Sequence, residues 1–509
     1  MNVRKTLEIN SRNLEACRLM AQLAEQMRSP QAISWRAQIV DLEPAVTANR
    51  LDLARTALLF GDISEAGNAL LLIADATTNT VDYQIVAFGV SIGEKDLAGA
   101  EAHCVRAAQL DPQNKSAQYN LAVLHLQSKD TNVFEQALSA MEKLADAPSH
   151  RRDALRALVD ALLNRGDFVR ARQYSARLES NPSALFEDRL LHLTSLRAAT
   201  NINTESYLSS LRLQAATNLN ETSVLAGWLR SHQMSDEALA WLNGLPEKMR
   251  TEPQVTEMIA GCYADRGDWA SAQAILEKQK WGTLDFIRLA MLARTYREQK
   301  QDSGARASWN LAITAAANQQ SALNSLFKMA STWGWTKEEE ALAWYILKRF
   351  PQERSILARL NQIYCAAGNT RGLQKVYSAL LRYEQSKTDR VTRNNFAALS
   401  LLLNTDTNRA HQIAHENYTQ NPEDKILAST YAYSLFLQGR TEEGLRTIEH
   451  LKPEELQDPA VATYYGILLV AAGQREKAMP FLEIALKAPL ALPEEKKLVA
   501  QAASPPNAN

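Results

Sequence analysis

The segment from Glu252 to Lys280 predicts a helical hairpin and, through it, the architecture of the whole chain. Two apolar stripes with helical spacing flank its turn, Arg266-Gly267-Asp268. The stripes consist of Ile259, Ala260 and Tyr263 in the first helix and of Ala272 and Leu276 in the second. Two helices of this length leave an apolar face in water unless neighbouring hairpins cover it. The segment therefore predicts an array of stacked hairpins.

The turn of this hairpin recurs along the chain. Counting from Gly267, equivalent turns fall near Arg28, Gly61, Lys95, Lys129, Gly166, Thr200, Gln233, Lys300, Thr336, Gly368, Thr405, Gly439 and Gly473. Twelve intervals span the 412 residues from Gly61 to Gly473, which gives a mean period near 34. A regular period of this length indicates one repeat architecture rather than several globular domains.

Small residues recur at two fixed distances from the turn, where the two helices of a hairpin must cross closely. Five residues after the turn stand Ala66, Ala100, Ala171, Ala238, Ala272, Ala305, Ala341, Ala410, Gly444 and Ala478, with Ala137 displaced by a loop insertion. Seven residues before the turn stand Ala21, Ala54, Ala122, Ala226, Ala260, Ala293, Ala398, Ala432 and Gly466. Residue types thus follow the same period as the turns.

Proline placement agrees with this spacing, because proline in a helix interior costs about 3 kcal/mol. The ends of second helices are predicted at Asp111-Pro112, Asn181-Pro182, Phe350-Pro351, Asn421-Pro422 and Asp458-Pro459. Pro480 falls inside the last second helix, so a shifted start or a kink is expected there.

On these residues the chain resembles the tetratricopeptide repeat (TPR) superfamily from about residue 12 to about residue 490. The resemblance implies an all-α fold, an α-solenoid of about 14 helix-turn-helix repeats forming a right-handed superhelix. The expected organisation is a remnant of a preceding repeat helix (1–13), an N-terminal array (14–189), a degenerate repeat (190–220), a C-terminal array (221–490), a capping helix (491–503) and a disordered tail (504–509).

Composition narrows the function classes. The 56 Lys and Arg residues nearly balance the 57 Asp and Glu residues, so no global basic surface favours nucleic acid. Cys17, Cys104, Cys262 and Cys365 lie far apart in helical patterns, which predicts small buried side chains. No apolar run reaches the roughly 18 residues that a membrane span needs, and the first residues lack the apolar region of a signal peptide.

Two motifs resemble catalytic ones without their partners. His411 and His415 have the spacing of a zinc-binding HExxH helix, but Gln412 replaces the general base, so a solvated helix face is expected. Ser325 and Lys328 form an SxxK pair that lacks its supporting motifs.

The remaining charged and glycine-containing patterns indicate no chemistry either. Glu339 and Glu340 are expected to be exposed helix charges. The glycine loops that hold phosphates do not occur in the sequence. We therefore expect a protein that is not an enzyme and that has no catalytic, cofactor-binding or metal-binding residues and no cofactor.

Tryptophan is concentrated in one part of the chain. Eight of the nine lie between residues 228 and 344, namely Trp228, Trp241, Trp269, Trp281, Trp309, Trp333, Trp335 and Trp344. Tryptophan is enriched at binding hot spots. Trp309, however, falls at a core position of the repeat, so packing between repeats is favoured over an anchor site.

The resemblance also implies where a partner binds, because the first helix of each repeat lines the concave face in this family. The corresponding residues are Tyr119, Arg156, Asp160, Glu257, Arg294, Arg297, Trp333, Gln362, Asn395 and Tyr433. Aromatic, cationic and amide groups together suit an extended peptide, whose backbone needs hydrogen-bond partners. An ordinary solvated surface explains the same residues equally well. The lysine and asparagine set with which some relatives hold a terminal carboxylate is not reproduced.

The expected function is a protein-protein interaction scaffold that binds a partner protein or an extended peptide on its concave surface, without nucleic acid. One alternative is a cell-envelope assembly or export factor whose N-terminal membrane anchor is missing from this chain. Residues Lys5 to Asn13 resemble the end of a second helix, which favours a missing upstream segment. Another alternative is a non-catalytic targeting region of an enzyme complex. The chain as written is expected in the cytoplasm, or in the periplasm or at a membrane if such a segment exists.

Overall fold

The structure, a computed structural model, describes residues 3, 6–7, 10, 12–73, 76–351, 355–383, 389–488 and 492–504. Within these residues the chain is an all-α solenoid of helical hairpins, and no β-strand is present. It divides into two units, Met1–Arg266 and Gly267–Asn509. The remnant helix expected over residues 1–13 and the tail expected over 504–509 fall largely outside the described residues. Within the described part, no helix is both long enough and apolar enough to cross a bilayer.

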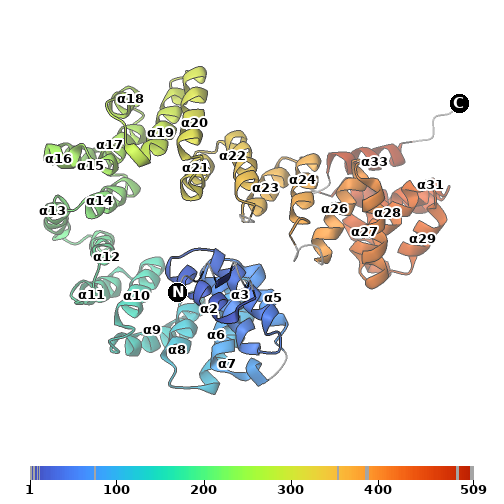
Figure 1. Cartoon of the computed structure of the whole chain (residues 1–509), viewed down its shortest axis with the longest axis horizontal. Coiled ribbons are helices and arrows are strands. Elements are labelled where there is room, and N and C mark those ends of the chain that lie inside the picture. Colours follow the sequence, from blue (N-terminus) through green and yellow to red (C-terminus); the bar gives the residue numbers. More distant parts are fainter. Residues whose placement is uncertain are drawn as a thin grey trace. The chain divides into compact units, whose positions relative to one another are not determined.

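Unit 1 is a succession of hairpins, each made of a first helix (helix A) and a second helix (helix B) (Figure 1). Its helices are α2 (Leu14–Gln26), α3 (Gln31–Leu42), α4 (Thr47–Leu59), α5 (Ile63–Leu71), η1 (Ala76–Asn79), α6 (Val81–Glu94), α7 (Leu97–Leu110), α8 (Lys115–His125), α9 (Thr131–Ala145), α10 (Arg151–Arg165), α11 (Phe168–Glu179), α12 (Phe186–Ala198), α13 (Thr204–Ala215), α14 (Leu219–Ser231), α15 (Ser235–Asn243), α16 (Glu247–Arg250) and α17 (Pro253–Asp265).

Unit 2 continues the pattern and closes with one unpaired helix, α33. Its helices are α18 (Trp269–Glu277), η2 (Gly282–Leu284), α19 (Asp285–Glu298), α20 (Asp302–Ala316), α21 (Gln320–Thr332), α22 (Thr336–Arg349), α23 (Ser355–Ala366), α24 (Thr370–Leu380), α26 (Arg390–Leu402), α27 (Thr407–Gln420), α28 (Lys425–Leu437), α29 (Thr441–Glu449), α30 (Pro453–Leu456), α31 (Pro459–Ala471), α32 (Arg475–Leu486) and α33 (Pro493–Ala503).

A residue with left-handed backbone ends most of the A helices. Positive φ occurs at eleven of the fourteen predicted turn residues, Arg28, Gly61, Lys95, Gly166, Thr200, Gln233, Gly267, Lys300, Gly368, Gly439 and Gly473. The amide of the next residue donates to a carbonyl five residues earlier, for example from Asp62 to Ala57 (2.9 Å). This Schellman-type ending satisfies carbonyl groups that the helix would otherwise leave without a partner.

The residue after the turn also starts helix B in several hairpins. Side-chain oxygens accept hydrogen bonds from the amide three residues on, in Asp62 from Glu65 (3.0 Å), in Asp96 from Gly99 (3.0 Å), in Asp167 from Arg170 (3.0 Å) and in Asn369 from Gly372 (2.9 Å). Such N-caps satisfy free amide groups of the next helix. One residue therefore ends one helix and begins the other, which fixes the hairpin locally.

The small residues predicted at the helix crossings are buried in most repeats. Ala66, Ala100, Ala171, Ala238, Ala410 and Ala478 after the turn, and Ala21, Ala54, Ala226, Ala293 and Ala432 before it, have no accessible surface. Gly444 shows why size matters, because a Cβ atom there would lie 2.6 Å from a Leu468 methyl group and 2.9 Å from the Ala432 carbonyl oxygen. Close approach of the two backbones thus excludes larger side chains.

The hairpin of α21 and α22 begins its turn earlier than predicted. Gly334, not Thr336, is the left-handed residue, with φ of 68°. Ala341 is consequently exposed, and Glu339 takes the position five residues after the turn with only 1% of its side chain accessible. The expectation that Glu339 is an exposed charge was wrong.

Glu339 is buried because a cation from the next hairpin neutralises it. Arg359 on α23 donates Nε–H and Nη2–H to the two oxygens of Glu339, at 2.7 and 3.1 Å. Glu340 is half-buried rather than exposed and accepts a hydrogen bond from the hydroxyl of Tyr364 at 2.7 Å. A charge at a crossing position is tolerated when it is paired and hydrogen-bonded.

Two further turns depart from the expected register. Asn404 and Asp406 have left-handed backbone on either side of Thr405, so Ala397, with no accessible surface, replaces Ala398 at the crossing. The turn near Lys129 closes without a left-handed residue. Asp130 instead accepts hydrogen bonds from the amides of Asn132 and Val133 and starts α9.

Two other expectations are corrected. Cys365 is exposed on α23, whereas Cys17, Cys104 and Cys262 are buried as predicted. Pro459 is the first residue of α31, a helix A, because Asp458 caps that helix by accepting from the Ala460 amide at 3.0 Å.

Pro480 lies inside α32, which begins at Arg475 without a shifted start.

Candidate partner-binding surface

The ten residues predicted to bind a partner lie on A helices, with one exception. Tyr119 lies on α8, Arg156 and Asp160 on α10, Glu257 on α17, Arg294 and Arg297 on α19, Gln362 on α23, Asn395 on α26 and Tyr433 on α28. Trp333 is the C-cap of α21. Four of them belong to unit 1 and six to unit 2.

A cavity between α8 and α10 in unit 1 brings three of the predicted residues together. Its volume is about 960 Å³, and Tyr119, Arg156 and Asp160 all line it. The other lining residues are Val123, Leu126, Gln127, Ser128, Lys129, Asp153, Ala157, Ala161, Asn164 and Arg165. Successive A helices therefore enclose a recess with both aromatic and charged walls.

Arg156 lies within ion-pair distance of Asp188 on α12. Asp188 has no accessible surface, and one of its oxygens lies 2.6 Å from Nε of Arg152 while the other lies 3.4 Å from Nε of Arg156. The amide of Leu185 also donates to Asp188, at 2.8 Å. Asp188 therefore faces two arginines. Its closer ion pair is with Arg152, and Arg156 remains partly exposed.

Asp160 has no comparable partner. None of the described residues makes a hydrogen bond or an ion pair with its carboxylate, although water reaches it inside the cavity. Burial raises the pKa of Asp160, and nearby Arg156 only partly opposes this shift. Burial, with the charges of Asp153 and Asp160, likewise raises the pKa of Tyr119. The side chain of Asp160 is exposed, so water weakens this shift, and the carboxylate can accept a hydrogen bond from a ligand in the cavity.

Glu257, further along unit 1, is also a carboxylate with a raised pKa and no ion pair with a described residue. It is half-buried on α17, and burial raises its pKa while Arg230 acts in the opposite direction. The guanidinium of Arg230 is engaged by Asp265 at 2.7 and 3.0 Å. It lies over Gly261, where a Cβ atom would be only 2.4 Å from its Nη1. Glu257 is therefore a second carboxylate on an A helix that has no hydrogen bond or ion pair with a described residue.

The two predicted arginines of unit 2, Arg294 and Arg297, make cation–π contacts with tryptophan rings. Arg294 lies over Trp269 and Trp333, with 5.5 and 5.3 Å from its Cζ to the ring centroids. Arg297 lies 3.8 Å from the centroid of Trp335 and pairs with Glu338 of α22. Such contacts hold neighbouring hairpins together. The tryptophans of this region pack between repeats, as expected.

The last three predicted residues differ in exposure. Gln362 is exposed and Asn395 is half-buried. Tyr433 is 3% exposed, and its ring lies 4.6 Å from that of Tyr464 on α31. Burial raises the pKa of Tyr433 to about 12. In this structure Tyr433 is therefore covered.

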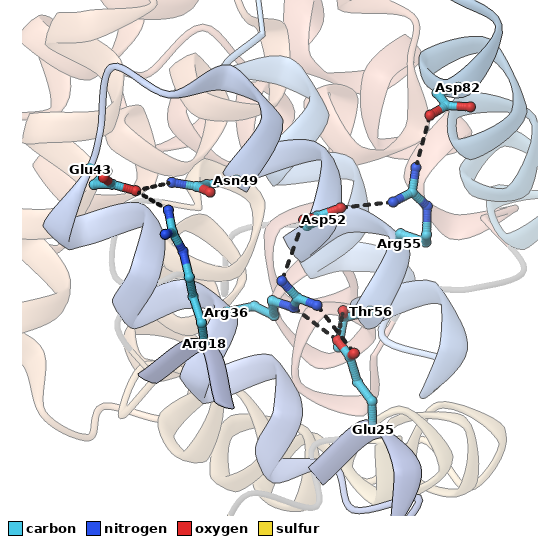
Figure 2. Close-up of polar contacts among 9 residues, drawn as sticks. All are labelled: Arg18, Glu25, Arg36, Glu43, Asn49, Asp52, Arg55, Thr56 and Asp82. Atoms are coloured by element: carbon cyan, nitrogen blue, oxygen red, sulfur yellow. Dashed lines mark hydrogen bonds and ion pairs between the residues drawn. The ribbon is translucent and has the colours of Figure 1, made fainter. Parts of the chain in front are cut away.

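A charged network on the first three hairpins was missed at the sequence level (Figure 2). Arg36 on α3 donates to both oxygens of Glu25, at 2.9 and 3.2 Å, and lies 3.4 Å from Asp52. Arg55 continues the network, 2.8 Å from Asp52 and 3.6 Å from Asp82. Figure 2 shows these side chains converging from α2, α3, α4 and α6.

This network borders a second cavity of about 640 Å³, which is lined by Glu25, Arg36, Asp52, Arg55, Thr56, Leu58 and Leu59. Burial would raise the pKa of Glu25, but hydrogen bonds from Arg36 and Thr56 lower it. The four charged residues that line this cavity therefore form ion pairs with one another. Glu25 and Arg55 stand at the same distances from their turns as Arg297 and Asp160, so the repeat spacing was a signal that could have found them.

A buried polar cluster joins α11, α12 and α13. Ser175 Oγ lies 2.8 Å from Nδ1 of His192, whose Nε2 lies 3.6 Å from Glu179. The hydroxyl of Tyr207 donates to Glu179 at 2.7 Å. Residue types and order resemble a catalytic triad, but Ser175 has no accessible surface. No substrate can reach this hydroxyl, so the cluster acts in packing.

The two histidines with zinc-site spacing serve different contacts. His411 is half-buried, and its Nδ1 lies 2.7 Å from Ser434 Oγ on the next hairpin, so the expectation of a solvated helix face was wrong for it. His415 is exposed beside Tyr431. Among the described residues, no group of three or more His, Cys, Asp or Glu side chains has the arrangement of a metal site.

No protein-family model matches the chain, and no curated protein matches it significantly. Among solved structures, it is similar to a tetratricopeptide repeat protein from Parabacteroides merdae, with 18% identity over 49% of this chain and 98% of that one and a TM-score of 0.26. It is also similar to the APC/C hetero-tetramer Cut9-Hcn1, with 14% identity, 85% and 92% coverage and a TM-score of 0.28. A third match is Naa15/Naa10 bound to HypK-THB, with 14% identity, 94% and 69% coverage and a TM-score of 0.24.

Superpositions with such low TM-scores do not establish the fold. The fold is therefore assigned from the geometry of the hairpins in this chain. Their turns recur at a period near 34 residues, left-handed residues end the A helices, and small residues are buried at the crossings. A helix-turn-helix unit that repeats every 34 residues or so is characteristic of tetratricopeptide repeats. The chain is a TPR-like repeat protein.

Proposed function

We propose that the protein is a non-catalytic interaction scaffold that binds an extended segment of a partner protein on the helix A side of unit 1. The observation that carries this proposal is the cavity between α8 and α10, in which Tyr119, Arg156 and Asp160 lie together. Extended segments need donors and acceptors along their backbone, and this recess supplies both.

The ionisable side chains Arg156, Asp160 and Glu257 support a binding role. Arg156 shares the carboxylate of Asp188 with Arg152, whereas Asp160 and Glu257 have raised pKa values because burial disfavours their ionised forms. Glu257 is partly buried, so its ionised form reduces the stability of the folded protein at neutral pH. Solvent weakens the same effect at Asp160, which is exposed. Proteins retain destabilising groups of this kind mainly where they bind or react. Backbone amides or a basic side chain of the partner would compensate both carboxylates.

Tyr119 adds a flat apolar surface to these polar groups. Its ring lines the cavity together with Val123 and Ala157. Aromatic side chains at the centre of a recess are typical anchors of interfaces, because they offer contact area at a low entropic cost. Binding energy in repeat proteins is commonly spread over several repeats, so the cavity is one contact of a longer surface.

The proposal is tested with a photo-crosslinking amino acid in the full chain. Placed at Val123, which lines the cavity, it is expected to capture one partner segment from cells. The matched control is the same amino acid at Gln136, which is exposed on α9 and does not line the cavity. Equal capture of the same proteins from both positions, or none from Val123, would contradict the proposal.

A further inference from the structure

The C-terminal helix α33 is held at its first turn by a distant part of unit 2. Glu494 accepts a hydrogen bond from the hydroxyl of Thr370, which is 124 residues away at the start of α24. Pro493 lies against the preceding turn, with two ring atoms 3.6 Å from the position of a Cβ on Gly368. Glu495 accepts a hydrogen bond from the hydroxyl of Tyr464 on α31, at 2.7 Å. The first turn of α33 therefore reaches back across several hairpins.

The other end of α33 is held by one arginine. Arg475, the first residue of α32, donates to the carbonyl oxygens of Ala502, Ala503 and Ser504 at 3.1, 2.6 and 2.6 Å. A cation at this place satisfies carbonyl groups that the helix itself leaves free and favours the negative end of the helix dipole. Both ends of α33 thus have specific polar partners.

The residues of α33 that face the protein follow a simple pattern. Two stripes at intervals of four residues consist of Glu494, Leu498 and Ala502 and of Glu495, Val499 and Ala503. Val499 is 2% exposed, and Leu498, Ala502 and Ala503 pack partly buried against the same core. Lys496 and Lys497 face water. The helix therefore presents acidic, aliphatic and small residues in successive turns to one surface.

Most of the side chains with which α33 contacts the protein are only partly buried. Val499 is the one residue of α33 with a buried side chain. A helix of 11 residues is also shorter than the roughly 12–15 residues that an isolated helix needs for stability. Its order depends on the surface it covers, and such peripheral elements open at low free energy.

The covered surface has the composition of a helix-binding site. The hydroxyl groups of Thr370 and Tyr464 bind carboxylates, and Arg475 binds the end of a helix. Tyr433, which the sequence predicted as a partner-binding residue, packs against Tyr464 beneath the first turn of α33. Aromatic rings between polar groups that select both ends of a helix favour one orientation of one kind of ligand.

We propose that this surface of unit 2 binds an amphipathic helix of a partner protein, and that α33 is its resident occupant, which the partner helix displaces. The fitting helix has two adjacent acidic residues in its first turn, two aliphatic residues one turn later and two small residues after a further turn. This inference concerns unit 2 alone and does not depend on the cavity of unit 1.

A fluorescent peptide with the sequence of residues 492–504 tests the proposal on the full chain. In the wild-type chain α33 occupies the surface, so the peptide should bind weakly. Val499→Asp puts a carboxylate at the one buried contact of α33 and should release the helix. The Kd of the peptide should then fall about ten-fold or more. The matched control is Ala500→Asp, which alters an exposed residue of the same helix and should leave the Kd at the wild-type value.

Two outcomes would overturn the proposal. One is equal binding of the peptide to the wild-type, Val499→Asp and Ala500→Asp chains, with circular dichroism showing that all three keep their helices. The other concerns the unaltered chain and needs no variant. If hydrogen exchange of α33 amides were as slow as that of α31 amides, α33 would be a fixed part of the fold and not a displaceable occupant.

Discussion

Two neighbouring hairpins of unit 1 reach the same backbone geometry with different side chains. In the hairpin of α10 and α11, Gly166 has a left-handed backbone, with φ of 77°, and Ala171 is fully buried at the crossing. In the hairpin of α12 and α13, Thr200 has a left-handed backbone, with φ of 50°, although it is β-branched. There the position five residues after the turn is the exposed Glu205. The turn geometry is shared, and the way in which the helices are held together is not.

The second hairpin differs because its helix B begins later. α11 begins two residues after Gly166, whereas α13 begins four residues after Thr200. The extra residues include Ile202, which is 95% exposed. In place of small residues at a crossing, the rings of His192 and Tyr207 meet with their centroids 5.1 Å apart and are both tied to α11, through Ser175 and Glu179. Leu193 on α12 is fully buried. A segment that lacks the usual repeat residues is therefore still an ordered hairpin.

The largest expected effect on stability comes from truncating a buried apolar side chain in the second hairpin. Leu193 has no accessible surface, so Leu193→Ala should leave a cavity and cost about 2–5 kcal/mol. Native-state hydrogen exchange of α12 and α13 amides measures this cost. The control is Leu213→Ala on α13, where the side chain is 77% exposed and the change should stay within about 0.5 kcal/mol. Equal costs at both positions would show that Leu193 does not fill the gap.

The next effect concerns the crossing in the regular hairpin. Ala171→Leu should overpack the contact of α10 with α11 and cost about 1–3 kcal/mol. Ala176→Leu, on the exposed side of α11, should change stability by no more than about 0.5 kcal/mol. Exchange of α10 and α11 amides reports both variants. If the two variants behaved alike, the crossing would not require a small residue.

The turns themselves should respond with opposite signs. Left-handed backbone costs a residue other than glycine about 1–2 kcal/mol, so Gly166→Ala should destabilise its hairpin. Thr200→Gly relieves this strain, and the added flexibility of glycine offsets about 0.5–1 kcal/mol of the gain. A small net stabilisation of α12 and α13 is therefore expected in hydrogen exchange. A loss of stability in Thr200→Gly would mean that the threonine side chain contributes more than its backbone costs.

The smallest effect at neutral pH belongs to His192. Burial lowers its pKa, Glu179 opposes this shift and Arg172 supports it. A lowered pKa means that the neutral ring contributes stability above the unfolded value of about 6.5, and that this contribution is lost as the pH falls.

Replacement of the ring should remove this pH dependence. His192→Gln should cost about 0.5–1.5 kcal/mol at pH 7.5, the usual value of one hydrogen bond. Urea unfolding followed by circular dichroism at several pH values should show the variant and the wild type converging below about pH 6.5. If the free energies of unfolding of the two proteins differed by the same amount at all pH values, titration of His192 would not contribute to the pH dependence of stability.

Both hairpins also shape the proposed binding site, because α10 lines the cavity and Asp188 of α12 lies within ion-pair distance of Arg156 at its wall. The sequence could predict that Tyr119, Arg156 and Asp160 lie on A helices, since the repeat period places them there. It could not predict that Asp188, 32 residues after Arg156, lies between Arg152 and Arg156, or that Asp160 makes no ion pair with a described residue. Such pairing depends on how hairpins stack, which helical periodicity does not encode.

The same limit explains the expectations that were wrong. The turn residues follow from local chemistry, because glycine and the aspartate after it end one helix and begin the next. Glu339 looked exposed because its partner Arg359 comes from another hairpin. Tyr433 looked available because the segment that covers it, α33, follows some sixty residues later in the chain. Local signals therefore predicted the hairpins, and contacts between hairpins decided which side chains are free.

The most direct test of the proposed site is the substitution Asp160→Asn, assayed for both stability and partner capture. Burial raises the pKa of Asp160, but its side chain is exposed, so the neutral amide should leave the thermal midpoint at pH 7 unchanged or slightly higher. Capture of the partner by the crosslinker at Val123 should fall in the same variant, because the partner loses its ionic acceptor. A lower midpoint together with undiminished capture would show that Asp160 serves the fold and not the partner.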